Sequence, residues 1–103
     1  MKLWLDDLRT PPDESWTWVK TSQEAMEMLD TGSIVEISLD HDLGSDLWNG
    51  YTVACHIENL AHHAGIKPPK WKIHSANPVG AENIARALES ADKEYAKRQD
   101  RTD

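Results

Sequence analysis

Three ionisable residues, Asp40, His41 and Asp42, stand in a row in the segment ISLDHDLG, directly after an apolar stretch. Aspartate can hold a metal ion or attack phosphorus, and histidine can transfer a proton near neutral pH. The segment is therefore a candidate for catalysis. Taken alone, it is equally well explained as a solvated loop that is closed by an Asx turn.

Two other apolar stretches also end in polar residues. KLWLDD ends in Asp6 and Asp7, and KWKIHS leads to His74 and Ser75. An Asp-Asp pair is often only a turn or a helix cap, and a single histidine at a strand end is more often structural than catalytic. The case for a site depends on all three groups meeting at one place, and the fold decides whether they do.

Short apolar and aromatic runs predict four strands, and apolar residues at helical spacing predict three helices. Thr21 with Glu24 is typical of a helix start, and Gly32 and Gly65 are typical of helix ends. The strands are expected at residues 2–6, 16–20, 33–40 and 70–75, and the helices at about 21–32, 49–64 and 78–95, with a frayed polar tail at 96–103.

Strands that alternate with helices predict an α/β fold with a parallel sheet and right-handed crossovers. The loop RTPPDES takes the place of a helix after the first strand, because Pro11 and Pro12 favour extended backbone. We expect a single domain over residues 1–103, built of three layers or of two unequal ones.

Ligands of an open parallel sheet bind beyond the carboxyl ends of its strands. If the first and third strands are neighbours, Asp6, Asp7 and Asp40 meet at that edge. Three carboxylates repel one another unless a cation lies between them, and their hard oxygen atoms suit Mg²⁺. The predicted cofactor is therefore a divalent metal, Mg²⁺, which in turn favours a phosphate ligand.

Other residues near the same edge suit a phosphate group. Arg9 carries a planar fork of N–H donors, Ser75 carries a hydroxyl, and SANPVG opens a helix whose free N–H groups favour an anion. The predicted phosphate-binding residues are Arg9, Ser75, Asn77 and Gly80, and the predicted catalytic residues are Asp40, His41, His74 and Asp42, with Asp42 orienting His41.

The overall charge limits the partners. The 103 residues include 11 basic and 18 acidic ones, which gives a net charge of −7. This charge disfavours extended duplex nucleic acid but is compatible with one phosphate held beside a metal ion. No apolar stretch is long enough for a membrane span or a secretory signal, so we expect a cytoplasmic protein without a membrane partner.

The motifs LWLDDLRTPP, ISLDHDLG and IHSANPVG resemble those of the cyclic-phosphate processing receiver domain, a divergent branch of the response-regulator receiver superfamily, over residues 2–95. The resemblance implies a truncated receiver-like (flavodoxin-like) α/β fold, with about four parallel strands in the order 2-1-3-4 and about three helices. It also implies that Asp6 and Asp7 hold the metal, that Asp40 takes the acceptor position and that Ser75 supplies a hydroxyl.

The chain departs from ordinary receivers after its final helix, where their fifth strand and its lysine have no counterpart. The sheet edge left by that strand is a place where self-association into a homo-oligomer is a hypothesis. The extra His41 and Asp42 beside the acceptor position favour an enzyme over a plain phosphoacceptor.

The resemblance implies an enzyme that acts on cyclic phosphates, with a nucleotide or an RNA 3′ end as its partner. We expect metal-dependent hydrolysis of a 2′,3′-cyclic phosphate, in which Asp40 or water attacks phosphorus and His41 or His74 protonates the leaving oxygen. Metal-free acid–base chemistry by the two histidines is an alternative mechanism. A non-catalytic module that binds a cyclic nucleotide or a protein, and a phosphoacceptor switch at Asp40, are the alternative functions.

Overall fold

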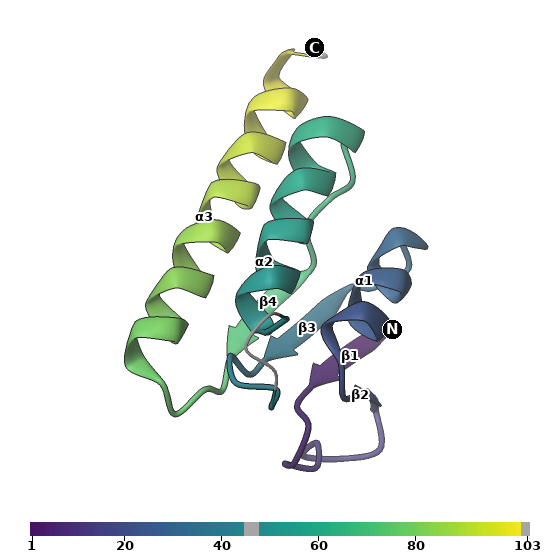
Figure 1. Cartoon of the computed structure of the whole chain (residues 1–103). Coiled ribbons are helices and arrows are strands. Elements are labelled where there is room, and N and C mark those ends of the chain that lie inside the picture. The colour runs from purple at the N-terminus through teal and green to yellow at the C-terminus, as the bar shows by residue number, and fades with distance from the viewer. Residues whose placement is uncertain (45–47, 102–103) are drawn as a thin grey trace.

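The computed structural model of the chain describes residues 1–44 and 48–101 (Figure 1). Every predicted strand and helix is present among them. The elements are β1 (Lys2–Leu5), β2 (Trp16–Val19), α1 (Ser22–Asp30), β3 (Glu36–Leu39), α2 (Gly50–Asn59), the π-helical turn η1 (Leu60–Ala64), β4 (Lys70–Ile73) and α3 (Pro78–Arg101). None of the helices in these residues is long and apolar enough to cross a membrane.

The clearest difference from the predicted boundaries is at the C-terminal end. The predicted helix at 78–95 continues to Arg101, so residues 96–101 of the expected frayed tail are helical, while 102–103 lie outside the described residues. Residues 96–101 consist largely of good helix formers such as Ala, Lys, Arg and Gln, which extend a helix without any apolar stripe. The Arg98 guanidinium also donates to the carbonyl oxygen of His62 at 2.6 Å, which anchors this part of α3 to η1.

The four strands are parallel and lie in the order β2-β1-β3-β4, as the resemblance implied. The backbone ladder continues one residue past the strands. There the N–H groups of Asp6, Asp40 and His74 donate to carbonyl oxygens of neighbouring strands at 3.0–3.2 Å. These three residues therefore leave the sheet side by side at its carboxyl edge.

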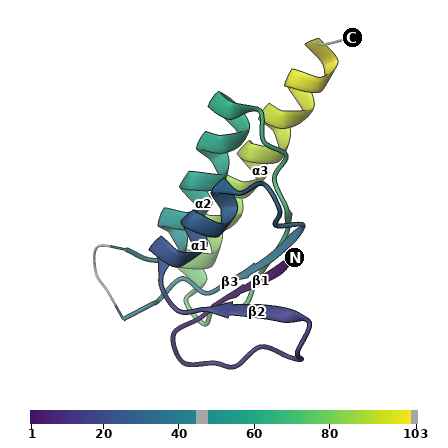
Figure 2. The ribbon, with the colours of Figure 1, turned by 90° about the vertical axis from the view of Figure 1, so that its right-hand side faces the viewer.

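One face of the sheet carries the core. The side chains of Leu3, Leu5, Ile37 and Leu39 alternate onto this face and are fully buried. They pack in one apolar cluster with residues of the three helices, and Figure 2 shows all three helices on the same side of the sheet. The fold is therefore the two-layer version of the predicted α/β domain.

The other face has no helix and is covered in part by tryptophan. The Trp4 indole is 7% exposed, stacks on the His74 ring at 3.9 Å and meets the Trp16 ring edge-on at 5.8 Å. The loop between β1 and β2 closes over it, because the Trp4 indole N–H donates to the Arg9 carbonyl oxygen at 2.8 Å. The Trp18 indole N–H donates to the Asp6 carbonyl oxygen at 2.7 Å. Indole rings thus hold the chain where β1 ends.

The start of α2 packs against the end of β3. Asn49 caps α2, since its side chain accepts from the Thr52 N–H while the Thr52 hydroxyl accepts from the Asn49 N–H. Gly50 is buried, and its N–H donates to the His41 carbonyl oxygen at 2.9 Å. A Cβ atom at Gly50 would collide with the Asp40 carbonyl oxygen. Only glycine therefore lets α2 approach the site this closely.

We predict that Gly50→Ala lowers the free energy of unfolding by about 3 kcal/mol, because backbone atoms have to move to admit one methyl group. Gly32→Ala is the control. It meets no atom within 4 Å, and its left-handed φ of 74° makes it cost only about 1 kcal/mol. Urea unfolding of both variants checks the difference, and equal losses would contradict this account of Gly50.

Candidate functional site

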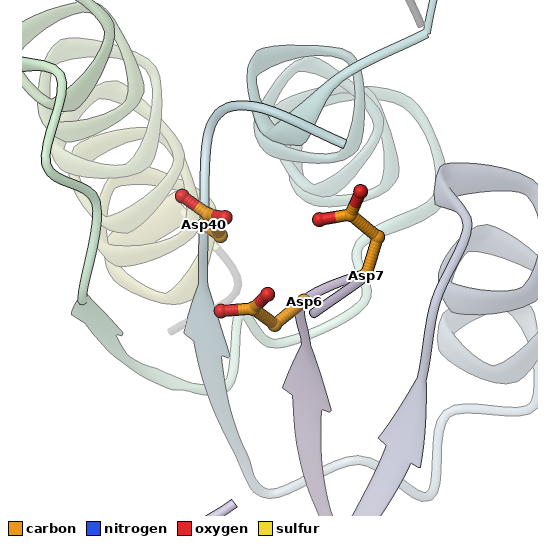
Figure 3. A group of neighbouring side chains, drawn as sticks. All are labelled: Asp6, Asp7 and Asp40. Atoms are coloured by element: carbon orange, nitrogen blue, oxygen red, sulfur yellow. The ribbon is translucent and has the colours of Figure 1, made fainter. Parts of the chain in front are cut away.

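The carboxylates of Asp6, Asp7 and Asp40 meet at the carboxyl ends of β1 and β3, as the sequence predicted. One oxygen from each residue lies within 4.8 Å of the other two. Figure 3 shows the three side chains around a common space above these two strands. Asp6 is buried, whereas Asp7 and Asp40 are partly exposed, so the space between them is reachable from solvent.

Asp6 is held by the loop that follows it. One of its oxygens, Oδ1, accepts from the N–H groups of Leu8 at 2.9 Å and Arg9 at 2.8 Å. The other, Oδ2, lies 3.1 Å from Nε2 of His74. Burial by itself raises the pKa of Asp6, but the two N–H donors and the imidazole together bring that pKa below its ordinary value. Asp6 is thus a fixed, ionised carboxylate.

The pKa of Asp40 is shifted in the opposite direction. Burial raises its pKa, and the negative charge of Asp6 raises it further, against smaller opposing effects of His74 and of nearby backbone N–H groups. The surrounding hydrogen-bond donors therefore do not fully offset the negative charge of the three carboxylates. Three such oxygen donors fit a hard divalent cation, and the open side of the cluster leaves room for further oxygen ligands.

His74 is fixed at both ring nitrogens. Its Nδ1 lies 2.7 Å from the Ser38 hydroxyl, its Nε2 faces Asp6, and its ring face is stacked on Trp4. Burial lowers the pKa of His74, although Asp6 and Asp40 act in the opposite direction. The ring therefore has a single orientation, and it supports the position of Asp6.

Sequence reasoning did not select Ser38 or Trp4. The available signal was strand alternation, because both residues lie on the sheet face that also carries His74. A serine that is 3% exposed within the apolar run ISL needs a hydrogen-bond partner, and His74 supplies it.

His41 directly follows Asp40 in the chain and differs from His74 in its contacts. Its Nδ1 lies 2.9 Å from Asp42 Oδ1, and this contact lowers the pKa of Asp42. Its ring lies against Gly80 in the first turn of α3, where any Cβ atom would collide with the imidazole. In residues 1–44 and 48–101, Nε2 of His41 has no hydrogen-bond partner. The predicted pairing with Asp42 is present, and it engages only one of the two ring nitrogens of His41.

The four predicted phosphate-binding residues lie around the same edge and contact their neighbours there. Arg9 Nη1 donates to the His74 carbonyl oxygen at 3.1 Å. The Asn77 N–H donates to the Ser75 hydroxyl at 3.1 Å, and the Gly80 N–H donates to Asn77 Oδ1 at 3.0 Å. Asn77 thus caps α3, and the N–H of Gly80 is already used. Phosphate binding by these residues stays a prediction.

Comparison with known families identifies the chain. The model of the family described as "Cyclic-phosphate processing Receiver domain" matches residues 1–90, so the chain belongs to this family. No curated protein and no solved structure matches the chain. The predicted family and the predicted receiver-like fold are both confirmed.

We predict that Asp40→Asn raises the melting temperature of the metal-free protein by a few degrees. The pKa of Asp40 is raised by folding, so its ionised form destabilises the folded state at neutral pH. The penalty disappears as the pH falls through the folded pKa, so the difference between variant and wild type should shrink on acidification. Thermal unfolding between neutral and acidic pH measures it.

The matched control is Glu89→Gln, which removes one negative charge from an exposed position of α3 far from the cluster in sequence. It should leave the melting temperature nearly unchanged. A lower melting temperature for Asp40→Asn would mean that the Asp40 carboxylate stabilises the fold, which contradicts the account of its burial and its repulsion by Asp6.

Proposed function

We propose that this member of the cyclic-phosphate processing receiver family is a metal-dependent phosphoesterase that hydrolyses cyclic phosphates, namely the 2′,3′-cyclic phosphate of an RNA end or of a nucleotide. The observation that carries the proposal is the meeting of the Asp6, Asp7 and Asp40 carboxylates. His41 directly follows Asp40 in the chain, and its Nδ1 is paired with Asp42. The family description supplies the class of substrate.

Asp6, Asp7 and Asp40 would hold the cation, with Mg²⁺ as the ion that their oxygens suit best. A bound divalent cation neutralises charge on the phosphate and polarises its P–O bonds. Asp6 supplies the fixed reference point of this arrangement, because the loop N–H groups and His74 set its orientation.

His41 is the proton donor in this proposal. Water adds its oxygen to phosphorus, the ring P–O bond breaks, and the released ribose oxygen takes a proton from Nε2 of His41. The proton lost by the water returns to the neutral ring and restores the imidazolium, so one water molecule is consumed and a monophosphate with a free neighbouring hydroxyl is formed. Asp42 holds the opposite ring nitrogen and sets the direction of Nε2.

Arg9 and Ser75 are suited to bind the remaining phosphate oxygens. The Arg9 guanidinium uses Nη1 on a backbone carbonyl and keeps its other N–H groups for an anion. The Ser75 oxygen accepts from the Asn77 N–H, so its own O–H is left to donate. His74 has a positioning role rather than a catalytic one, because both of its nitrogens are engaged within the protein.

We predict that the protein converts nucleoside 2′,3′-cyclic phosphates to monophosphates with Mg²⁺, and that a chelator abolishes the reaction. Asp7→Asn and Asp40→Asn should lower kcat/KM by roughly a hundredfold or more, since each removes a ligand rather than a supporting residue. Glu89→Gln should keep full activity. Product formation is followed by chromatography.

Full activity with chelator present, or in both aspartate variants, would refute the metal-dependent mechanism. Tight binding of the cyclic nucleotide by calorimetry without any turnover would identify a binding module instead of an enzyme.

We predict that His41→Gln and His74→Gln differ in how they respond to the leaving group. His41→Gln should slow hydrolysis of a nucleoside cyclic phosphate by roughly 10²–10⁴-fold, but it should affect an aryl phosphodiester much less, since its leaving group needs no proton. His74→Gln should slow both substrates to the same degree, because it disturbs Asp6. Equal losses on both substrates in His41→Gln would exclude His41 as the proton donor.

A further inference from the structure

A cavity of about 350 Å³ lies at the amino ends of β3 and β4, whereas the carboxylates of Asp6, Asp7 and Asp40 lie at the carboxyl ends of the strands. Its lining comes from two short segments, residues 32–35 directly before β3 and residues 67–70, which run into the first residue of β4. Figure 2 shows both segments at the end of the sheet where the N-terminus lies, away from the strand arrowheads. Pockets for small molecules begin at roughly 300 Å³, so this amino-edge cavity admits a compact ligand.

Buried apolar residues form the floor of the amino-edge cavity. Ile34 is 7% exposed, and Pro68 and Pro69 are both buried. A narrower space that shares these three residues continues to Leu29 and Ile57 of the core cluster. A proline has a fixed φ and no N–H group, so the two adjacent proline rings give the floor a rigid apolar surface. The floor therefore favours a ligand with an apolar body.

Val35 adds an apolar wall, although the residue is 62% exposed. Its backbone is fixed, because its N–H donates to the Met1 carbonyl oxygen at 2.9 Å and its carbonyl oxygen accepts from the Lys70 N–H at 3.0 Å. A valine side chain has few rotamers, so this residue stays exposed unless another molecule covers it. Burial of apolar surface is favourable in water, so a ligand that covers Val35 gains free energy from it.

Two lysines carry the charge of the lining. Lys67 and Lys70 are exposed, and neither forms an ion pair among the residues that the structure describes. The acidic residue next to Val35, Glu36, lies 4.0 Å from Lys72 instead. The cavity thus combines apolar walls with a local positive charge, in a chain whose net charge is −7. This combination favours an anionic ligand over a neutral or cationic one.

We infer that the amino-edge cavity binds a small organic carboxylate with an apolar body. The body packs on Ile34, Val35 and the two prolines, and the carboxylate group lies beside the two lysines. The inference does not rest on the proposed function, because the cavity shares no residue with the aspartate cluster of the proposed active site. It places a second ligand site at the end of β3 opposite to Asp40.

The direct test is titration of the full chain with 2-naphthoate, a carboxylate on a flat apolar body, followed by NMR. A chelator is added, so that no metal ion at the aspartate cluster binds the probe. The amide signals of Val35, Lys67 and Lys70 should shift and reach saturation. 2-Naphthamide has the same body without the charge and should bind roughly tenfold more weakly. Acetate has the charge without the body and should not shift these signals at the same concentrations.

Paired variants assign the contacts. Lys67→Gln and Lys70→Gln should each weaken 2-naphthoate binding roughly threefold and leave 2-naphthamide binding unchanged. Lys93→Gln removes an exposed lysine of α3 outside the cavity and should change neither. Val35→Thr should weaken both ligands roughly threefold, because a hydroxyl replaces a methyl group, whereas Val79→Thr alters an exposed valine outside the cavity and should have no effect. All of these positions are exposed, so thermal unfolding should show intact folds.

Several outcomes overturn the inference. These are the absence of saturable shifts at the lining residues, equal affinities for 2-naphthoate and 2-naphthamide, and equal affinities of the two lysine variants and Lys93→Gln for 2-naphthoate. Loss of 2-naphthoate binding in Asp40→Asn would place the ligand at the aspartate cluster and overturns it as well. Hydrolysis of a cyclic phosphate without 2-naphthoate binding overturns the inference and leaves the proposed function standing. Binding of 2-naphthoate at the lining residues without any hydrolysis supports the inference and overturns only the proposed function.

Discussion

The buried carboxylate of Asp6 joins the parts of the site to one another. It accepts hydrogen bonds from the N–H groups of Leu8 and Arg9, which fixes the loop after β1. It also faces the ring of His74, which follows β4. A carboxylate that is 2% exposed is tolerated only because these donors replace its water. Burial raises the pKa of Asp40 on the neighbouring strand, and the charge of Asp6 raises it further. Loop shape, imidazole orientation and the electrostatics of the cluster therefore all depend on one side chain.

No helix lies in residues 6–15, between β1 and β2, and this affects how the Asp6 carboxylate is supported. The sheet face that such a helix would cover is shielded by Trp4, which lies between Trp16 and His74. Stacking on Trp4 limits the His74 ring to rotation within its own plane, and the hydrogen bonds to Ser38 and Asp6 prevent that rotation. Three of the five tryptophans, Trp4, Trp16 and Trp18, lie on this face of the sheet. Indole rings take over the shielding of the second face and at the same time support the site.

The arrangement of the strands and the meeting of the three aspartates could be predicted, because each strand is an apolar run that ends in a charge and parallel strands share one carboxyl edge. The hydrogen-bond partners of His74 could not be predicted, because they depend on which residue of β3 lies on the same face of the sheet and next to His74 in the strand register. The full length of α3 was missed for a similar reason. The apolar stripe ends at Tyr95, whereas the helix is anchored further along by Arg98 on η1, a contact remote in sequence. Local patterns predict elements, but pairings across the fold decide which polar atoms remain available.

The like charges of Asp6, Asp7 and Asp40 repel one another, and this repulsion costs folding free energy. The cost does not arise from the packing of the core, whose apolar cluster is well buried. Gly44, with its left-handed φ of 73°, comes so close to Asp7 that a Cβ atom there would lie 3.2 Å from the Asp7 Oδ2 atom. A glycine at this position therefore keeps the approach to the Asp7 carboxylate free of a further side chain. A cation held between the three carboxylates would offset their repulsion, so the same charges that weaken the fold favour binding of the ion.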